Sequence, residues 1–310
     1  MIFNKPNYWN TRISVLSIIL LPLTLIVFTI TFLKQNITKS KKYEIPILCI
    51  GNIYIGGTGK TPTSIFIAKK LKESGHNPAI LRKFYKSHSD EHGLIKNKFN
   101  NLILSKNRKD GILKSQNANF DSVILDDGFQ DYSIKKDLIV LCFNQNQLIG
   151  NGMILPSGPL REGLNSLKRA DIILINGKKD VKFENKILKI NENLEIFYSN
   201  YIPVNLDEFR NKKLIAVAGI GNPENFFITL EENNIKKKKK KIFPDHYKFS
   251  RNEIQNLINE ADKLNCQIIM TEKDYFKIKD YNISKIKYLK VSLEIDNSDK
   301  FLNKIKKIYD

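Results

Sequence analysis

A short glycine-rich stretch between an apolar run and a helical pattern constrains this chain more than any other feature. The stretch reads Ile55-Gly56-Gly57-Thr58-Gly59-Lys60-Thr61. It follows the apolar residues 45–50 and precedes a helical pattern at 63–71. A strand, a glycine loop and a helix in this order are typical of a phosphate-binding loop, in which backbone N–H groups and the helix dipole face phosphate oxygens. Lys60 is expected to reach the terminal phosphates, and the Thr61 hydroxyl to bind Mg²⁺. The alternative is a glycine turn that serves packing alone.

A second apolar run ends in two acids and supports this interpretation. Residues 122–125 are Ser-Val-Ile-Leu, and Asp126 and Asp127 follow them. An acid at the end of such a strand, beside a phosphate loop, can hold Mg²⁺ directly or through water. Asp at the end of a strand is also common simply because it favours turns. A glycine loop about 65 residues upstream makes metal binding the favoured interpretation of the two acids.

An uncharged stretch near the amino terminus predicts contact with a membrane. Residues 13–33 carry no charge, and Arg12 and Lys34 bracket them. As one helix they would reach about 31 Å, close to the roughly 30 Å hydrocarbon core of a bilayer. The alternatives are a buried helix of a soluble protein, and a helix kinked at Pro22 that enters the bilayer without crossing it. Lysines that follow the stretch predict that the rest of the chain lies on the cytoplasmic face.

The net charge is compatible with this location. The chain has 51 Lys and Arg against 32 Asp and Glu, a formal net charge of +19. Such a surface favours anionic headgroups, phosphorylated substrates or nucleic acid, although a coding bias towards lysine would give the same excess. No recognition helix or stacking-aromatic motif is visible, so nucleic acid is not expected as a partner. The lysines at 236–241 are expected at a solvated edge or loop.

The cysteines and the alternation of patterns indicate a reduced α/β protein. Three isolated cysteines lie within apolar runs, as expected of reduced, structural thiols: Cys49, Cys142 and Cys266. Apolar strands alternating with helices predict a doubly wound, mostly parallel sheet with a second, smaller α/β domain. The expected first strands are 45–50, 78–82, 101–105, 121–126, 137–143 and 171–175. The expected later elements are strands 213–218, 239–243, 267–270 and 287–292, with helices at 222–233, 251–264 and 298–308.

The expected organisation has three parts. Residues 1–42 form an amino-terminal membrane segment, 43–205 the domain that carries the phosphate loop, and 206–310 the smaller domain. Residues 195–206 look irregular and are expected to connect the two domains.

Several motifs in one order resemble the tetraacyldisaccharide 4′-kinase family, the lipid A 4′-kinases. The first are Gly51-Asn52, the glycine loop with Pro62, and Asp126-Asp127-Gly128-Phe129-Gln130. The others are Leu155-Pro156-Ser157-Gly158-Pro159-Leu160-Arg161-Glu162, Arg169-Ala170-Asp171, Ala218-Gly219-Ile220-Gly221-Asn222-Pro223, Phe243-Pro244-Asp245-His246 and Thr271-Glu272-Lys273-Asp274. The resemblance covers nearly the whole chain.

The resemblance implies an ATP- and Mg²⁺-dependent kinase. Its substrate would be a membrane lipid, a tetraacylated glucosamine disaccharide 1-phosphate, phosphorylated on the 4′-hydroxyl. Because acyl chains keep this substrate in the bilayer, the enzyme is expected at the inner membrane with its catalytic domains on the cytoplasmic face. No obligate protein partner is expected.

The resemblance also assigns residues on the acceptor side. Asp90, in Ser-Asp-Glu-His, is the candidate base on the sugar hydroxyl, and His246 is the histidine that assists it from the second domain. Lys60 and Asp127 complete the expected catalytic set. Arg161 and Glu162 match positions expected to contact the disaccharide headgroup, with a structural salt bridge as the alternative.

The chain departs from the family pattern in one region. The segment after the second strand reads Arg82-Lys83-Phe84-Tyr85, where the family has Arg-Gly-Tyr-Gly. Asp131 follows Gln130 where the family has histidine, which removes a cation expected near the substrate phosphate.

Other classes of protein share parts of the pattern. A membrane-associated ATPase of the partitioning type shares the glycine loop, but that class has lysine where Ile55 stands and has no need of the 155–162 segment. A GTPase would carry a guanine-binding Asn-Lys-x-Asp, which is absent. A membrane-tethered binding protein without catalysis would not need Lys60, Thr61 and the acid pair together.

Overall fold

The computed structural model describes residues 6–10, 14–85, 89–244, 247–281 and 283–310, and they group into two compact units. The larger unit consists of Lys5–Phe84, Phe99–Asn200 and Leu293–Asp310. The smaller unit includes Tyr85–Lys98 and Tyr201–Ser292. Both units are discontinuous in sequence, so they do not coincide with the continuous ranges 43–205 and 206–310.

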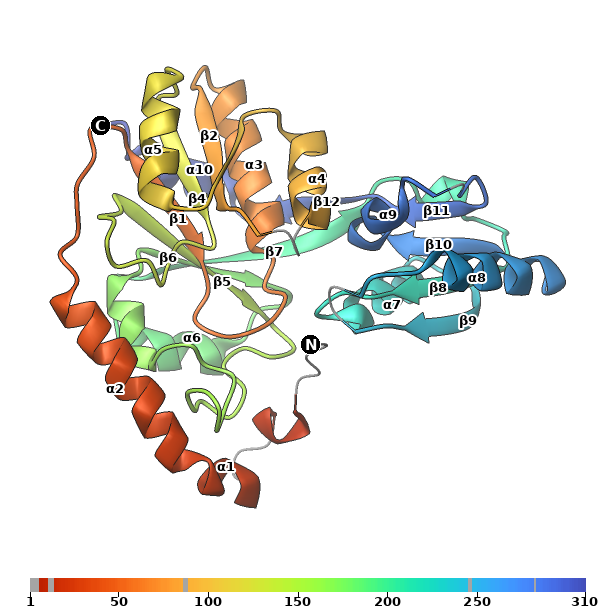
Figure 1. Ribbon diagram of the computed structural model, residues 1–310, viewed down its shortest axis with the longest axis horizontal. Helices are drawn as coiled ribbons and strands as arrows, with labels where there is room; N and C mark the ends of the chain where they lie inside the picture. Colours follow the sequence, from red (N-terminus) through yellow and green to blue (C-terminus); the bar gives the residue numbers. More distant parts are fainter. Residues whose placement is uncertain (1–5, 11–13, 86–88, 245–246, 282) are drawn as a thin grey trace. The chain divides into compact units, whose positions relative to one another are not determined.

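The larger unit is built on an eight-stranded sheet with the order β12-β7-β6-β5-β1-β4-β2-β3 (Figure 1). Every neighbouring pair from β3 across to β7 is parallel. The strands are β1 (Ile47–Gly51), β2 (Pro78–Lys83), β3 (Leu102–Ser105), β4 (Ser122–Asp126), β5 (Leu138–Asn144), β6 (Ile172–Asn176), β7 (Glu195–Pro203) and β12 (Val291–Ile295). The large parallel sheet predicted from the alternation of apolar strands and helices is confirmed.

Helices cover both faces of this sheet. They are α3 (Lys60–Glu73), α5 (Arg108–Asn117), α6 (Val181–Leu188) and α10 (Ser298–Lys306), with the 3₁₀ helix η3 (Leu164–Arg169). Ile112 of α5 and Phe183 of α6 share one hydrophobic core, so these two helices lie on the same face. Helix α3 lies on the other face, where Thr63 contacts Cys142 of β5 and the helix packs against α10.

The central strands are buried along their whole length, and their register positions the site. Every residue of β1 and β4 is buried, as expected of strands covered by helices on both faces. The two strands pair in parallel with Ile50 opposite Asp126. The glycine loop after β1 and the acids after β4 therefore emerge side by side at the carboxyl edge of the sheet, where ligands bind in open α/β folds.

The smaller unit has a four-stranded sheet of its own, with the order β11-β10-β8-β9 and all pairs parallel. The strands are β8 (Leu214–Ala218), β9 (Lys237–Ile242), β10 (Gln267–Thr271) and β11 (Ile286–Leu289). The helices are α4 (Ser89–Lys98), α7 (Pro223–Glu232), α8 (Arg251–Lys263) and α9 (Glu272–Ile278), with the 3₁₀ helix η4 (Leu206–Glu208). Helix α4 packs against α9, and Lys98 forms an ion pair with Glu272.

Most of the lysine run forms the edge strand β9, and four of its lysines form ion pairs within the fold. Lys239 and Lys241 form ion pairs with Glu260 of α8. Lys240 pairs with Glu224 of α7 at 2.8 Å. Successive side chains of a strand point to opposite faces, so one strand serves both flanking helices. Charged side chains on an exposed edge also oppose pairing with another chain.

Two details of the strand prediction are wrong. Residues 195–206, expected to be irregular, contain β7, because Ile196, Phe197 and Tyr198 continue the sheet beside β6. The single strand expected at 287–292 is two strands that meet around Lys290. Here β11 belongs to the small sheet and β12 to the large one.

The single amino-terminal membrane helix expected at 13–33 is also not found. After the 3₁₀ helix η1 (Asn7–Trp9), the described chain forms α1 (Val15–Ile19) and α2 (Leu21–Ile37). The apolar run is divided because Pro22 lacks an N–H and fits only the first turn of a helix, so a new helix begins there. Among the residues that the structure describes, no helix is long and apolar enough to cross a membrane.

The position of α10 in the larger unit can be tested with Phe301, which is fully buried and packs edge-on against Phe197 of β7. We expect Phe301→Ala to lower the free energy of unfolding by about 3–5 kcal/mol, the usual cost of removing a buried aromatic ring. Urea unfolding followed by circular dichroism measures this. Asn303→Ala, an exposed position of the same helix, is the control. A loss no larger than that of the control would show that α10 does not pack on the sheet.

Candidate active site

The glycine loop, residues 52–59, leaves the end of β1 and leads directly into α3. Gly59 is the N-cap of α3 and has φ 87°, a left-handed conformation that is costly for residues with a Cβ. This turn lets the helix begin at Lys60, so the first N–H groups of α3 face the loop. The structure therefore places the glycine loop between a strand and a helix, as the sequence predicts, and its role in binding phosphate stays a prediction.

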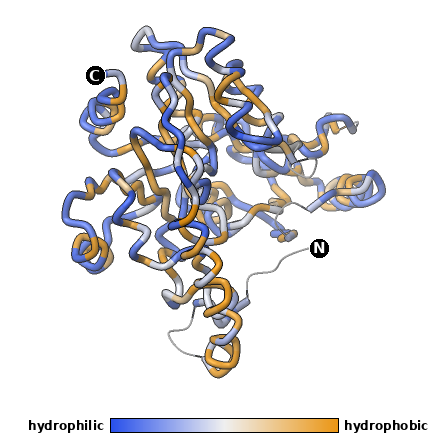
Figure 2. The backbone as a smooth tube through the Cα atoms, turned by 60° about the vertical axis from the view of Figure 1, so that its left-hand side comes forward, coloured by the Kyte–Doolittle hydropathy of each residue, from blue (hydrophilic) through white to orange (hydrophobic). Residues whose placement is uncertain are grey.

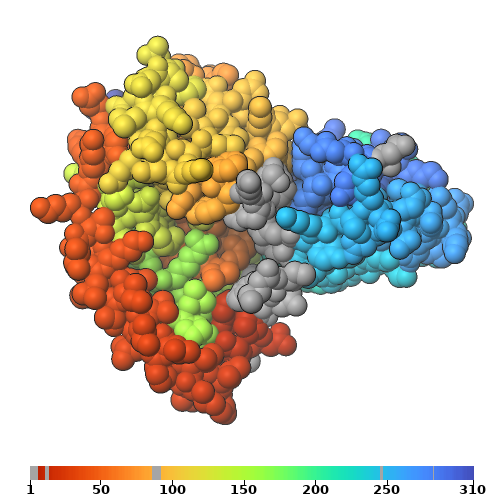
Figure 3. All heavy atoms as spheres, in the orientation of Figure 1, coloured from red at the N-terminus to blue at the C-terminus, as the bar shows by residue number. Residues whose placement is uncertain are grey.

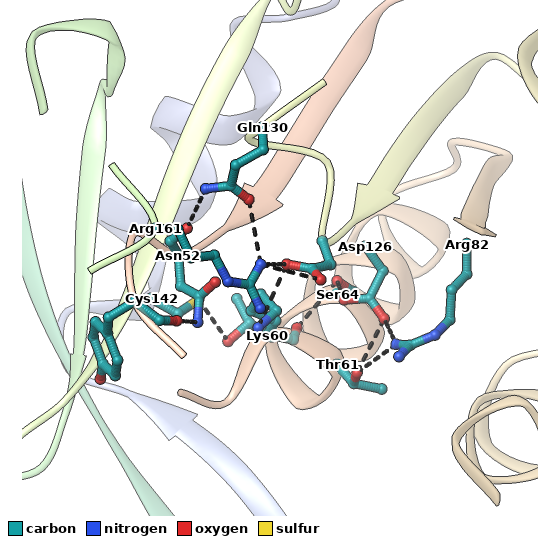
Figure 4. A network of polar contacts seen from close by, with 12 residues as sticks. Asn52, Lys60, Thr61, Ser64, Arg82, Asp126, Gln130, Cys142 and Arg161 are labelled. Carbon is teal, nitrogen blue, oxygen red and sulfur yellow. Dashed lines mark hydrogen bonds and ion pairs between the residues drawn. The ribbon is translucent and has the colours of Figure 1, made fainter. Parts of the chain in front are cut away.

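The first acid of the pair, Asp126, is fully buried and lies against the start of α3 (Figure 4). Its Oδ2 accepts a hydrogen bond from the Thr61 hydroxyl at 3.0 Å. Arg82 of β2 forms an ion pair with the same oxygen and donates to Thr61 Oγ1 at 3.0 Å. Ser64 lies 3.4 Å from Asp126 Oδ1. The predicted partners Thr61 and Asp126 are thus brought together, with Arg82 beside them.

The second acid, Asp127, faces the loop lysine. Its Oδ1 lies 3.6 Å from Lys60 Nζ and 3.1 Å from Arg161 NH1. Asp127 has φ 64°, which turns the chain sharply at the end of β4 and separates the directions of the two acids. Its carbonyl oxygen accepts a hydrogen bond from Arg108 at 2.5 Å. The structure therefore brings together Lys60, Asp127 and Arg161, as the sequence predicts for the first two.

The charges around Asp127 keep it ionised. Burial alone would raise the pKa of Asp127, but the cations around it, Lys60 first and then Arg161, hold that pKa well below its ordinary value of 3.8. An ionised acid close to a lysine and two arginines gives a site with alternating charge. Such a site suits a ligand that carries both phosphate oxygens and a metal ion.

Several residues of this site were not assigned from the sequence. Gln130 joins the motifs, because its Oε1 accepts from Arg161 at 3.3 Å and its Nε2 donates to Asn52 O at 2.9 Å. Arg108, at the start of α5, pairs with Asp131 at 3.3 Å. Thus an arginine stands beside the acid that replaces the family's histidine. Gln130 and Asn52 belong to motifs already recognised, and Arg82 matches the arginine of the family's Arg-Gly-Tyr-Gly, whereas nothing in the local sequence around Arg108 indicates a site.

Glu162 lies apart from the two acids. It is buried and forms an ion pair with Arg169, whose guanidinium stacks on the Phe129 ring at 4.2 Å. This is the structural salt bridge considered as the alternative for Glu162. The contact of Glu162 with the substrate stays a prediction.

The two residues assigned to the acceptor side are only partly within the described chain. Asp90 is in the first turn of α4, which belongs to the smaller unit, and its side chain is outside the described part. His246 also lies outside the described residues. Both assignments stay predictions.

The residues present fit a nucleotide with its magnesium ion. Thr61 Oγ1 and Asp126 Oδ2 are hard oxygen donors 3.0 Å apart, the ligand type that Mg²⁺ prefers. Thr58, within the glycine loop, is almost fully buried, and within the described residues its hydroxyl has no hydrogen-bond partner. A buried hydroxyl without a partner is costly, and a phosphate oxygen would satisfy it.

The fold and the arrangement of the site are those expected of one class of protein, the α/β phosphotransferases with a glycine loop and paired acids at the carboxyl edge of a parallel sheet. Comparison with known proteins then identifies the family. The family model described as "Tetraacyldisaccharide-1-P 4'-kinase" matches residues 16–310. The chain therefore belongs to the tetraacyldisaccharide 4′-kinase family, and the family and enzyme class predicted from its motifs are confirmed. The partitioning-type ATPase is not favoured.

Individual relatives agree over the full length. The chain is 37% identical over 312 residues to a tetraacyldisaccharide 4′-kinase of Pelagibacter ubique, covering 99% of both chains. It is 32% identical to that of Rickettsia felis, covering 97% of this chain and 96% of the relative. A crystal structure of LpxK from Aquifex aeolicus, described as in complex with ATP, matches with a TM-score of 0.69 and 24% identity. It covers 95% of this chain and 100% of that one, and supports the fold.

The charge balance at Asp127 predicts a pH-dependent contribution to stability. The folded-state pKa is lowered, so the stabilisation is present above the ordinary value of 3.8 and is lost as the pH falls through the folded-state pKa. Asparagine tolerates the left-handed backbone of this position, so Asp127→Asn removes only the charge. We expect the variant to unfold more easily than the wild type at pH 7, and the difference to shrink below pH 4.

Urea unfolding of the wild type and of Asp127→Asn, at pH 7 and again below pH 4, measures the difference in stability. Asp280→Asn, an exposed acid of the smaller unit, is the control. A variant as stable as the wild type at pH 7 would contradict the balance of charges inferred here.

Proposed function

We propose that this kinase transfers the γ-phosphoryl group of ATP to the 4′-hydroxyl of a tetraacylated glucosamine disaccharide 1-phosphate. The observation that carries the proposal is the glycine loop and its lysine facing two acids at the end of the neighbouring strand. Phosphoryl transfer depends mainly on positioning and on neutralising charge, and both are built into this edge of the sheet.

Each residue at this edge has a role in holding ATP. Backbone N–H groups of the glycine loop and of the first turn of α3 bind the phosphates, and Lys60 neutralises the terminal ones. Thr61, Asp126 and Asp127 would hold Mg²⁺. The ion supplies neutralisation of charge on the transferred group. Arg82 and Arg161 balance the acids while they hold the metal, and the ATP complex of the Aquifex aeolicus structure supports the choice of nucleotide.

The acceptor side is assigned through the family resemblance. Asp90 accepts the proton of the sugar hydroxyl, and His246 assists it. Arg161 is paired with Asp127, but its guanidinium is partly exposed. The exposed part can bind an anionic headgroup.

The amino-terminal helices place the enzyme at its lipid substrate. Most of the exposed large apolar side chains of the described chain lie between Val15 and Ile37, and α2 has no buried residue. Figure 2 shows these helices as mainly hydrophobic, and Figure 3 shows their atoms, red to orange, at the surface. Helix α2 has 17 residues and reaches about 26 Å, less than the roughly 30 Å of a hydrocarbon core. Its apolar surface enters the bilayer without crossing it.

The charge pattern supports the inner membrane as location, with both units on its cytoplasmic face. Lys34 lies in the last turn of α2, and Lys39, Lys41 and Lys42 follow it. Lysines beside a membrane-inserted helix bind anionic headgroups and favour the cytoplasmic side.

The role of the loop lysine is tested with Lys60→Ala. We expect the rate of lipid phosphorylation to fall by about two orders of magnitude or more, because charge on the terminal phosphates is no longer neutralised. Mass spectrometry of the disaccharide 1-phosphate after incubation with Mg-ATP detects the second phosphate. Lys69→Ala, on the same helix, is the control. Transfer at the wild-type rate by the folded Lys60 variant would refute the phosphate-loop assignment.

Membrane insertion is tested by replacing three exposed side chains, Ile19, Leu25 and Ile26, with asparagine. Each buried large apolar side chain is worth about 1.5–3 kcal/mol of transfer from water, so we expect binding to anionic vesicles to fall more than tenfold. Flotation at high salt removes the electrostatic contribution. Leu113→Asn, which replaces an exposed leucine of α5, is the control. Unchanged flotation of the triple variant would place the membrane contact elsewhere.

A further inference from the structure

One segment of the larger unit contacts both the amino-terminal helices and the glycine loop. It runs from Asn151 to Arg161 and is called the strap. Figure 1 shows how the loops of this region lie between α2 and the sheet. The strap contains the Pro-Ser-Gly-Pro-Leu-Arg signature, of which the proposed function uses only the final arginine.

On one side, the strap is hydrogen-bonded to the amino-terminal segment. The Thr24 hydroxyl of α2 lies 2.8 Å from Ser157 Oγ and accepts the Ser157 N–H at 3.1 Å, and Ser157 is fully buried. Trp9 donates its indole N–H to Pro156 O at 3.1 Å. Gly150, just before the strap, has φ 56°, and a Cβ there would lie 2.7 Å from Trp9 O. The backbones at Gly150 and Trp9 therefore pack directly against each other, which is a specific contact between the two segments.

The strap is internally fixed. Asn151 donates to Ser157 O at 2.9 Å and accepts from Met153 N at 3.0 Å. The Leu155 N–H donates to Leu160 O at 2.9 Å and the Leu160 N–H donates to Met153 O at 3.1 Å, so the first and second halves of the strap are held together. A displacement at Ser157 is therefore transmitted to Leu160 and its neighbours, because densely bonded segments move as a unit.

On the other side, the strap holds the glycine loop and an acid of the site. The Ile55 N–H donates to Pro159 O at 2.9 Å, and the Arg161 N–H donates to Ile53 O at 2.7 Å. These bonds fix the entry to the glycine loop directly before Gly56. Arg161 then reaches Asp127 Oδ1 at 3.1 Å. The loop and the acid pair are thus joined to α2 through one continuous set of hydrogen bonds.

We propose that Thr24 and Ser157 are positioning residues for nucleotide binding: by fixing the strap to α2, they set the glycine loop and Arg161 in the geometry that binds ATP. The inference rests on the proposed nucleotide role of the glycine loop and requires nothing of the membrane. Coupling between two sites is reciprocal, so nucleotide binding also changes the surroundings of the strap's amino-terminal contacts.

Trp9 provides a direct readout, because it is the only tryptophan in the chain and is buried against the strap. The first measurement titrates the full chain in detergent with Mg²⁺ and the non-hydrolysable ATP analogue AMPPNP, and follows Trp9 fluorescence. Coupling predicts a saturable change in emission whose midpoint equals the dissociation constant from calorimetry. Calorimetric binding without any change in emission would overturn the proposal.

The second measurement uses matched variants of α2. Thr24→Val removes the hydroxyl that bonds to Ser157, and Thr29→Val removes one that bonds only to Leu25 O of its own helix. We expect Thr24→Val to weaken AMPPNP binding about three- to tenfold, the usual effect of losing one or two hydrogen bonds, while vesicle binding is unchanged. Thr29→Val should leave AMPPNP binding unchanged.

Ser157→Ala and the double variant complete the cycle. If the two hydroxyls act through each other, the double variant binds AMPPNP no worse than the weaker single variant. Suppose that Thr24→Val keeps the melting temperature of the wild type and binds AMPPNP with the same affinity. That result would overturn the positioning role. If the wild type does not bind AMPPNP, the assignment of the glycine loop itself is refuted. This outcome differs from the one above, and it also removes the basis of the present inference.

Discussion

The interaction on which the site depends is the attraction between two adjacent acids at the end of β4 and the cations that surround them. Asp126 is fully buried against Arg82 and Thr61, and Asp127 faces Lys60 and Arg161. Buried carboxylates are costly unless they are paired and hydrogen-bonded. Here the partners come from the glycine loop, from β2 and from the strap. The acids thus hold three separate segments at one edge of the sheet, and the same charges suit a metal-bound triphosphate.

The parallel sheet explains why these segments meet. Strands β1 and β4 are neighbours, and their carboxyl ends carry the glycine loop and the acid pair. The proposed lipid substrate would add a second requirement, since the site would have to be brought to a bilayer. The exposed apolar surface of the amino-terminal helices is what we propose to meet it, and the strap connects these helices to the glycine loop. The glycine loop and the amino-terminal helices are therefore parts of one hydrogen-bonded unit.

The sequence predicts best what local chemistry determines. Glycine spacing identified the loop, and the acids after an apolar strand identified its partner, because both depend on a few adjacent residues. Pro22 predicts an interruption within 13–33, one of the alternatives for this stretch, but not that the stretch forms two separate helices. Strand β7 and the separation of β11 from β12 depend on which sheet offers a free edge, which no local pattern records. Arg82 and Arg108 reach the site only because β2 and α5 lie beside β4, so their roles needed the fold.

The most direct test of this account is the position of the metal ion in a crystal of the protein grown with AMPPNP and Mn²⁺ in place of Mg²⁺. Mn²⁺ scatters anomalously and also accepts oxygen ligands. We expect one strong anomalous peak beside Thr61 Oγ1 and Asp126, with the terminal phosphates next to Lys60. A metal peak remote from both acids, or a triphosphate bound away from the glycine loop, would contradict the account.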